Sequence, residues 1–131
     1  MNFESFSRQM LTSNAEPHVT IHKRGTLSLN RPAYEAIGSP ASVELLFDRG
    51  AQIVGLRGVP HDVANAYHVR ASTPSPSGPW VISAIAFTKY YDIDTTRSLR
   101  WPAHVQDGIL CVDLTSAAVP VTSNRARNDA P

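Results

Sequence analysis

Short segments of alternating apolar and polar residues, separated by turn residues, run along the first half of the chain. Residues 19–21, 27–29 and 43–48 alternate with a period of two, which is typical of half-buried strands. Asp48-Arg49-Gly50 is a hairpin turn signal, and residues 53–57 follow it as the return strand. This half is therefore predicted to contain two pairs of strands.

A short helix is predicted between these two pairs. Asn30 is a residue type that caps helix N-termini, and Pro32 lies in the first turn that follows. Tyr34 and Ile37 share one helical face, and Gly38 is typical of a helix end. The expected order is strand, strand, helix over about 31–38, strand, strand.

The second half of the chain repeats this order of features. Residues 25–38 match residues 78–91 without a gap, which predicts a second helix near 83–91. This match aligns the N-cap candidates Asn30 and Ser83, and the apolar residues Tyr34 with Phe87 and Ile37 with Tyr90.

The closing strands match at a slightly longer offset. Residues 43–56 correspond to 99–112, and the turn Gln106-Asp107-Gly108 lies near the position equivalent to the first hairpin turn. The first strand corresponds to residues 68–70, with a longer loop, 72–77, after it. Because the two halves share almost no identical residues, a chance match of two short patterns is the alternative to a duplication.

The pattern of the first half resembles a known family, the AbrB/MazE-like swapped-hairpin DNA-binding domain of the transition-state regulator type. The similar segments are an opening strand, a basic-glycine turn with the strand after it, a helix ending in Ile-Gly, and a closing hairpin: Thr20-Ile21, 23–29, 34–38, and 43–45 with 53–56. One position departs from the family, which usually has proline where Asn30 stands.

The resemblance implies a fold as well as an activity. In that family two chains interlock their hairpins into one small barrel, so a duplicated chain could build the barrel alone. We therefore expect a mainly β fold with two short helices, a barrel-like swapped-hairpin pseudo-dimer of two ββαββ halves. The halves are 17–60 and 61–114, between a flexible N-terminal arm, 1–16, and a disordered tail, 115–131. With 131 residues, of which 42% are apolar, the chain has enough apolar side chains to form one hydrophobic core.

The resemblance also implies that the protein binds duplex DNA, as a transcriptional regulator or chromosome-associated factor. Basic residues on the first turn and near the helix start reach DNA in that family. By position these are Lys23, Arg24 and Arg31, with Arg49 as a weaker candidate. The second half has no matching cations at these positions, so a monomer would bind weakly and self-association would strengthen binding. A merely solvated basic face is the alternative.

Net charge and the N-terminal arm suggest a second function. Twelve basic residues against eleven acidic ones leave a formal charge of +1, which excludes a histone-like polycation. Phe3, Phe6 and Met10 could share a helical face and anchor a partner protein. The alternative is therefore an adaptor, including an antitoxin-like one, that uses this arm and does not bind DNA.

The sequence contains no motif of an enzyme, cofactor or metal site. It has no nucleophile elbow or phosphate loop, its histidines lack the spacing of a metal site, and Cys111 alternates with apolar residues like a small core residue. We therefore expect a protein that is not an enzyme and holds no cofactor or metal. A single cysteine and no apolar stretch long enough for a signal peptide or membrane span predict a cytoplasmic protein without membrane contact.

Overall fold

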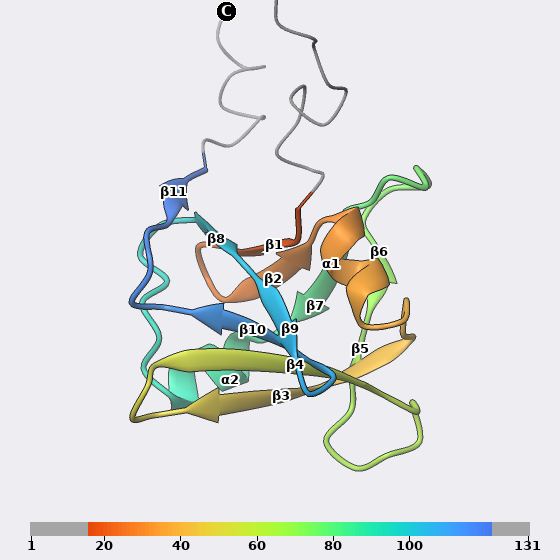
Figure 1. Ribbon diagram of the computed structural model, residues 1–131, viewed down its shortest axis with the longest axis horizontal. Coiled ribbons are helices and arrows are strands. Elements are labelled where there is room, and N and C mark those ends of the chain that lie inside the picture. The colour runs from red at the N-terminus through yellow and green to blue at the C-terminus, as the bar shows by residue number, and fades with distance from the viewer. Residues whose placement is uncertain (1–15, 122–131) are drawn as a thin grey trace, which may run out of the picture.

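The computed structural model describes residues 16–121 of the chain, which form two antiparallel sheets and two short helices (Figure 1). Sheet A has the strand order β11-β8-β1-β2-β7-β6, and sheet B has the order β5-β3-β4-β10-β9. The expectation of a mainly β fold with two short helices is confirmed. The elements are β1 (His18–Ile21), β2 (Thr26–Leu29), α1 (Arg31–Ala36), β3 (Ser42–Asp48), β4 (Ile53–Val59), β5 (Tyr67–His68), β6 (Arg70–Ala71), β7 (Trp80–Ser83), α2 (Ile85–Tyr90), β8 (Leu99–Pro102), β9 (His104–Gln106), β10 (Ile109–Asp113) and β11 (Val119–Pro120).

Two single-residue links pass directly from one sheet to the other. Val69 separates β5 from β6, and its N–H donates to the Ala41 carbonyl at 2.9 Å. Ala103 separates β8 from β9, and its N–H donates to the Pro17 carbonyl at 3.1 Å. Because both sheets share these links, they close around one core.

The core follows from the alternation in the strands. Inward side chains from sheet A meet inward side chains from sheet B, and the space between them is filled by aliphatic residues. The fully buried ones are Val19, Leu27, Leu29 and Ile82 from sheet A, and Val43, Val54, Leu56, Leu110 and Val112 from sheet B.

Strands from the two parts of the chain pair with each other throughout the fold. The hairpins β1–β2 and β3–β4 come from the first part, and β6–β7 and β9–β10 from the second. The two parts contact each other through four strand pairs: β2–β7, β4–β10, β1–β8 and β3–β5. In β2–β7 Ser28 lies opposite Val81, 53 residues later, and in β4–β10 Gly55 lies opposite Cys111, 56 residues later.

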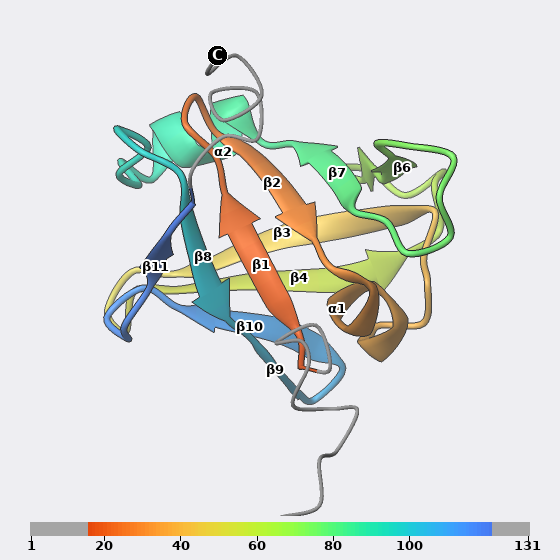
Figure 2. The ribbon, with the colours of Figure 1, turned by 90° about the horizontal axis from the view of Figure 1, so that it is seen from above.

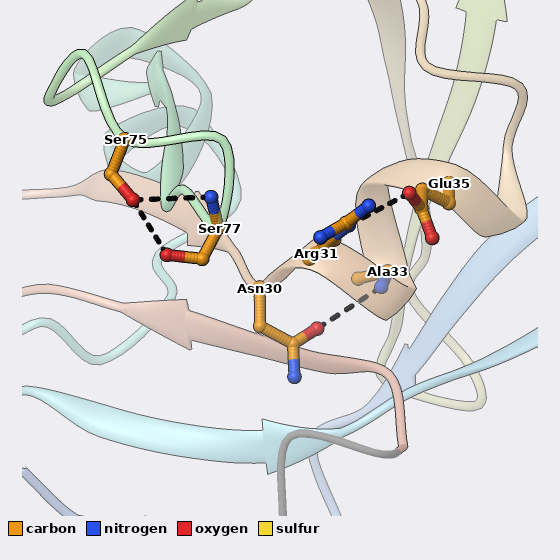
Figure 3. Close-up of polar contacts among 6 residues, drawn as sticks. All are labelled: Asn30, Arg31, Ala33, Glu35, Ser75 and Ser77. Carbon is orange, nitrogen blue, oxygen red and sulfur yellow. Dashed lines mark hydrogen bonds and ion pairs between the residues drawn. The ribbon is translucent and has the colours of Figure 1, made fainter.

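Asn30 caps α1 as predicted. Its Oδ1 accepts a hydrogen bond from the N–H group of Ala33 at 3.0 Å (Figure 3). The same oxygen accepts from the His18 N–H at 3.0 Å, and Nδ2 donates to the Glu16 carbonyl at 2.8 Å. One side chain thus satisfies the helix start and joins it to the start of β1. Gly38, just after α1, has a φ of +86°, which ends the helix.

The prediction that Ser83 caps the second helix is wrong. Ser83 is the last residue of β7, and Ala84 is the N-cap of α2 without a side-chain hydrogen bond. Both helices end in the same way: the Ser39 N–H donates to the Tyr34 carbonyl, and the Ile93 N–H to the Thr88 carbonyl. Equivalent positions in the two helices are therefore 54 residues apart, one more than the sequence match suggests.

This extra residue changes which tyrosine packs. Tyr90, predicted on the apolar helix face, is 71% exposed, and Tyr91 packs against the core instead. Tyr91 contacts Phe47 and Phe87, with ring centroids 4.8 and 5.2 Å away. The prediction for Tyr90 is therefore wrong, because Tyr91, and not Tyr90, packs against Phe47 of β3.

The predicted tail begins too early. Residues 115–131 were expected to be disordered, but Val119 and Pro120 pair with β8, and the Val121 N–H donates to the Ser98 carbonyl at 3.0 Å. Asp113 accepts hydrogen bonds from the N–H and the hydroxyl of Thr115, which orders the turn after β10. Residues 1–15 and 122–131 lie outside the described part.

Replacing Asn30 with alanine should lower the free energy of unfolding by about 1–2 kcal/mol, because the capping bond and its link to the start of β1 are lost together. Urea unfolding of the full chain measures this. Arg31→Ala, in the same turn, is the matched control: its ion pair with Glu35 is more than half exposed, and we expect a change below about 0.5 kcal/mol. Equal losses in both variants would contradict the role of the cap.

The turn between β1 and β2 packs closely on α2, and a pair of glycine variants should show it. A Cβ on Gly25 would lie 2.5 Å from Thr88 Oγ1 and 3.1 Å from the Ile85 Cα, whereas a Cβ on Gly38 would meet nothing within 4 Å. Both glycines have positive φ, so both alanine variants carry the same kind of backbone strain. Gly25→Ala should destabilise the protein by roughly 1–3 kcal/mol more than Gly38→Ala in urea unfolding.

Candidate nucleic-acid interface

The outer face of sheet A carries hydroxyl groups and cations. Val19, Leu27 and Ile82 point into the core, so their neighbours along each strand point outward. No aspartate or glutamate occurs in any strand of this sheet. We call this surface the sheet A face: His18, Thr20, Thr26, Ser28, Arg70, Val81, Ser83, Arg100, Pro102 and Val119.

Two arginines lie in one row across this face. The strand registers place Arg100 opposite Thr20, Thr20 opposite Ser28, Ser28 opposite Val81, and Val81 opposite Arg70. Four strand spacings of about 4.8 Å put the two arginine Cα atoms roughly 19 Å apart. Figure 2 shows this sheet toward the viewer, with α1 and α2 beyond opposite ends of β1 and β2.

A histidine lies over the middle of the face. His22 Nε2 and Ser28 Oγ are 2.8 Å apart and hydrogen-bonded, and Ser28 is only 8% exposed. Burial lowers the pKa of His22 below its usual value of 6.5. His22 is therefore neutral near pH 7, and the positive charge of the sheet A face comes from arginine and lysine.

Lys23 and Arg24, both predicted to contact DNA, lie in the β1–β2 turn at one end of this face. The Lys23 N–H donates to Ser98 Oγ at 2.9 Å, which ties the turn to the loop before β8. Arg24 has a φ of +83° and, with Lys89 of α2 and Asp92 after it, lines a hollow. The turn therefore adds two cations to the edge of the sheet A face.

Arg31 and Arg49, the other two predicted residues, are elsewhere. Arg31 Nε donates to Glu35 Oε2 at 2.9 Å, so its charge is paired on α1 (Figure 3). Arg49 lies in the β3–β4 turn of sheet B, with its guanidinium 4.8 Å from the ring centroid of Tyr91 and 5.7 Å from that of Tyr90. The four predicted residues thus do not form one surface.

Sequence reasoning missed Arg70 and Arg100. The signal was present, because each arginine alternates with apolar neighbours and so points outward from its strand. The net charge of the chain does not reveal them, because it also counts the acids of the second half, which lie in loops and in sheet B. Only the strand order shows that both arginines share one face with the β1–β2 turn.

Residues 16–121 contain no cluster of three or more histidine, cysteine or carboxylate side chains that could hold a metal ion. Cys111 is half-buried, and its Sγ donates to the Ile109 carbonyl at 3.5 Å. Burial raises the pKa of this thiol, which keeps it in the unreactive protonated form near neutral pH. The predicted partner anchor, Phe3, Phe6 and Met10, lies outside the described residues.

Comparisons with protein-family models, with curated proteins and with solved structures find no match to this chain. Neither helix in residues 16–121 has the length and apolar character needed to cross a membrane. The case for function therefore depends on the chemistry of the surfaces just described.

The lowered pKa of His22 makes stability depend on pH. In the unfolded chain His22 takes up a proton at its usual pKa of 6.5, whereas in the folded chain its pKa is lower. The stability that is present above pH 6.5 is therefore lost as the pH falls from 6.5 through the pKa of His22 in the folded protein. The urea midpoint should therefore be lower at about pH 5 than at about pH 7.5. His22→Gln should reduce this difference; an unchanged difference would contradict the assignment to His22.

Proposed function

We propose that this protein binds duplex DNA with the sheet A face and the β1–β2 turn, as a small regulator or chromosome-associated factor without enzymatic activity. The observation that carries the proposal is the charge pattern of sheet A. Arg70, Arg100, Lys23 and Arg24 lie on or beside a surface of hydroxyl groups whose strands contain no carboxylate.

The chemistry of this face suits a phosphate backbone. Lysine and arginine neutralise phosphates and release counterions, while the hydroxyls of Thr20, Thr26 and Ser83, which are not buried, can donate hydrogen bonds to phosphate oxygens. A carboxylate among them would repel the same phosphates, and the strands of sheet A bring none. Sheet B differs, since Glu44, Asp48 and Asp113 lie in its strands.

The pairing of strands supports the further proposal that the fold is a duplicated swapped hairpin. A twofold axis through an antiparallel strand pair places one pair of equivalent residues, the pair on the axis, directly opposite each other. Ser28 and Val81, and likewise Gly55 and Cys111, lie opposite each other at the two offsets of the sequence repeat. This arrangement favours the family resemblance of residues 19–57, in which DNA binding is the common activity.

The number of cations sets the expected strength of binding. Four contacts, from Lys23, Arg24, Arg70 and Arg100, give a slope of about −4 for log affinity against log salt concentration. Such a footprint binds weakly at physiological salt. Self-association that places two sheet A faces on one duplex would raise the affinity through a second set of contacts.

The test is a titration of the full chain into a labelled duplex at several salt concentrations, followed by fluorescence anisotropy. Arg70→Gln/Arg100→Gln and Lys23→Ala/Arg24→Ala should each weaken binding and reduce the salt slope by about two. Arg49→Gln/Arg57→Gln is the matched control, because it removes the same charge from the sheet B side, where Arg57 pairs with Glu44.

Two results would overturn the proposal. One is the absence of duplex binding by the wild-type chain at low salt. The other is an equal loss of affinity in the control variant, because binding would then follow net charge and not the sheet A face.

A further inference from the structure

β3 is paired along only part of one edge. On one side β4 pairs with it over its whole length, while on the other side β5 pairs only with Ser42 and Val43. The chain before β5 turns away from β3: Asn65 has a φ of +71°, and the Ala66 N–H donates to the Val63 carbonyl. In Figure 1, β5 passes close to the start of β3, and α2 lies behind its other end.

The backbone of Leu45 faces this open side. The Ala41 carbonyl accepts from the Val69 N–H on the β5 side, and successive residues of a strand direct their backbone groups to alternate sides. Val43 and Leu45 therefore face the same side as Ala41. Val43 pairs with Tyr67, whereas Leu45 has no hydrogen bond on this side within residues 16–121.

A hollow of about 480 Å³ opens where the pairing with β5 ends. Its walls are β3, the start of β5 and one side of α2, and they include Leu45, Tyr67, Phe87, Tyr90 and Tyr91. Tyr90 is the most exposed large side chain of this wall, at 71%. Such a site suits an extended peptide: its backbone can pair with the open strand edge while one of its apolar side chains packs against the aromatic rings.

A positive charge stands at one end of the hollow. The Arg49 guanidinium lies over the rings of Tyr90 and Tyr91, and no carboxylate forms an ion pair with it within residues 16–121. Glu44 also lines the hollow, but its carboxylate is paired with Arg57. An added strand antiparallel to β3 would begin at this end, because β3 itself ends in the Asp48–Arg49 turn. Charge complementarity therefore places an acidic residue on the N-terminal side of the bound segment.

We propose that this hollow binds an extended peptide segment of a partner protein, which adds as an antiparallel strand beside Leu45. Its backbone N–H and C=O pair with those of Leu45, an apolar side chain enters the aromatic hollow, and a preceding acidic side chain meets Arg49. The site lies on a different sheet from the proposed DNA interface and does not depend on it.

The experiment starts from a phage-displayed library of random peptides selected on the full chain. The proposal predicts enriched sequences with an acidic residue shortly before an aromatic or aliphatic one. A synthetic peptide of the enriched sequence, labelled for fluorescence anisotropy, then serves as the probe.

Two changes should each weaken binding of this peptide by roughly ten-fold or more, the scale of one lost hydrogen bond or aromatic contact in a binding site. One is Tyr90→Ala in the protein, and the other is N-methylation of the peptide bond that pairs with Leu45. Arg49→Gln should weaken peptides with the acidic residue and leave peptides without it unchanged.

Ile85→Ala is the matched control. Ile85 is an apolar residue of the same helix, 44% exposed, and it lies away from the hollow. This variant should keep full peptide affinity, and urea unfolding checks that Tyr90→Ala is folded.

Three outcomes would overturn the proposal. The first is that no sequence is enriched on the full chain. The second is that peptide binding survives both Tyr90→Ala and N-methylation. The third is a dimer, detected by sedimentation, that Tyr90→Ala dissociates, because a second copy of this chain would then occupy the edge.

Discussion

The fold depends on two antiparallel contacts between distant parts of the chain, β2 with β7 and β4 with β10. Without them β2 and β4 would each keep a single neighbour, and the core would lose Ile82, Leu110 and Val112. A hairpin pair of about forty residues cannot bury enough apolar area to offset its conformational entropy. Joining both parts in one chain makes this closure independent of protein concentration.

Alternation and capping chemistry account for what could be predicted from the sequence. The strands around Val19, Leu27 and Val54 alternate clearly because one side of each meets the core and the other does not. Asn30 could be predicted as a cap because its carboxamide oxygen can reach the N–H groups at the start of a helix. These are local properties, and local reasoning is sufficient for them.

The start of α2 needed information that the sequence pattern does not contain. Ser83 is a capping residue type, but it pairs with Thr26 in the ladder of sheet A, so the strand continues through it. The helix then starts one residue later than predicted, so Tyr91 takes the core-facing position that was predicted for Tyr90. Tyr90 and Tyr91 are equivalent in a pattern of apolar positions; the contacts of Tyr91 with Phe47 and Phe87 distinguish them.

The candidate interface was harder still, because it is a property of strand order. Arg70 and Arg100 are far apart in the chain and on strands separated by three others, yet they lie in one row of the same face. Lys23 and Arg24 could be found from the turn alone, whereas Arg49 belongs to the opposite sheet. Charge therefore has to be counted by sheet and not by chain segment.

A net charge of +1 conceals two sheets of different character. Carboxylates occur in the strands of sheet B and not in those of sheet A, which is why the proposed DNA interface is assigned to sheet A. The partly unpaired edge of β3 belongs to sheet B, and the backbone groups of Leu45 on this edge can pair with an added strand. Because the two surfaces use different strands and different chemistry, occupation of one leaves the groups of the other available.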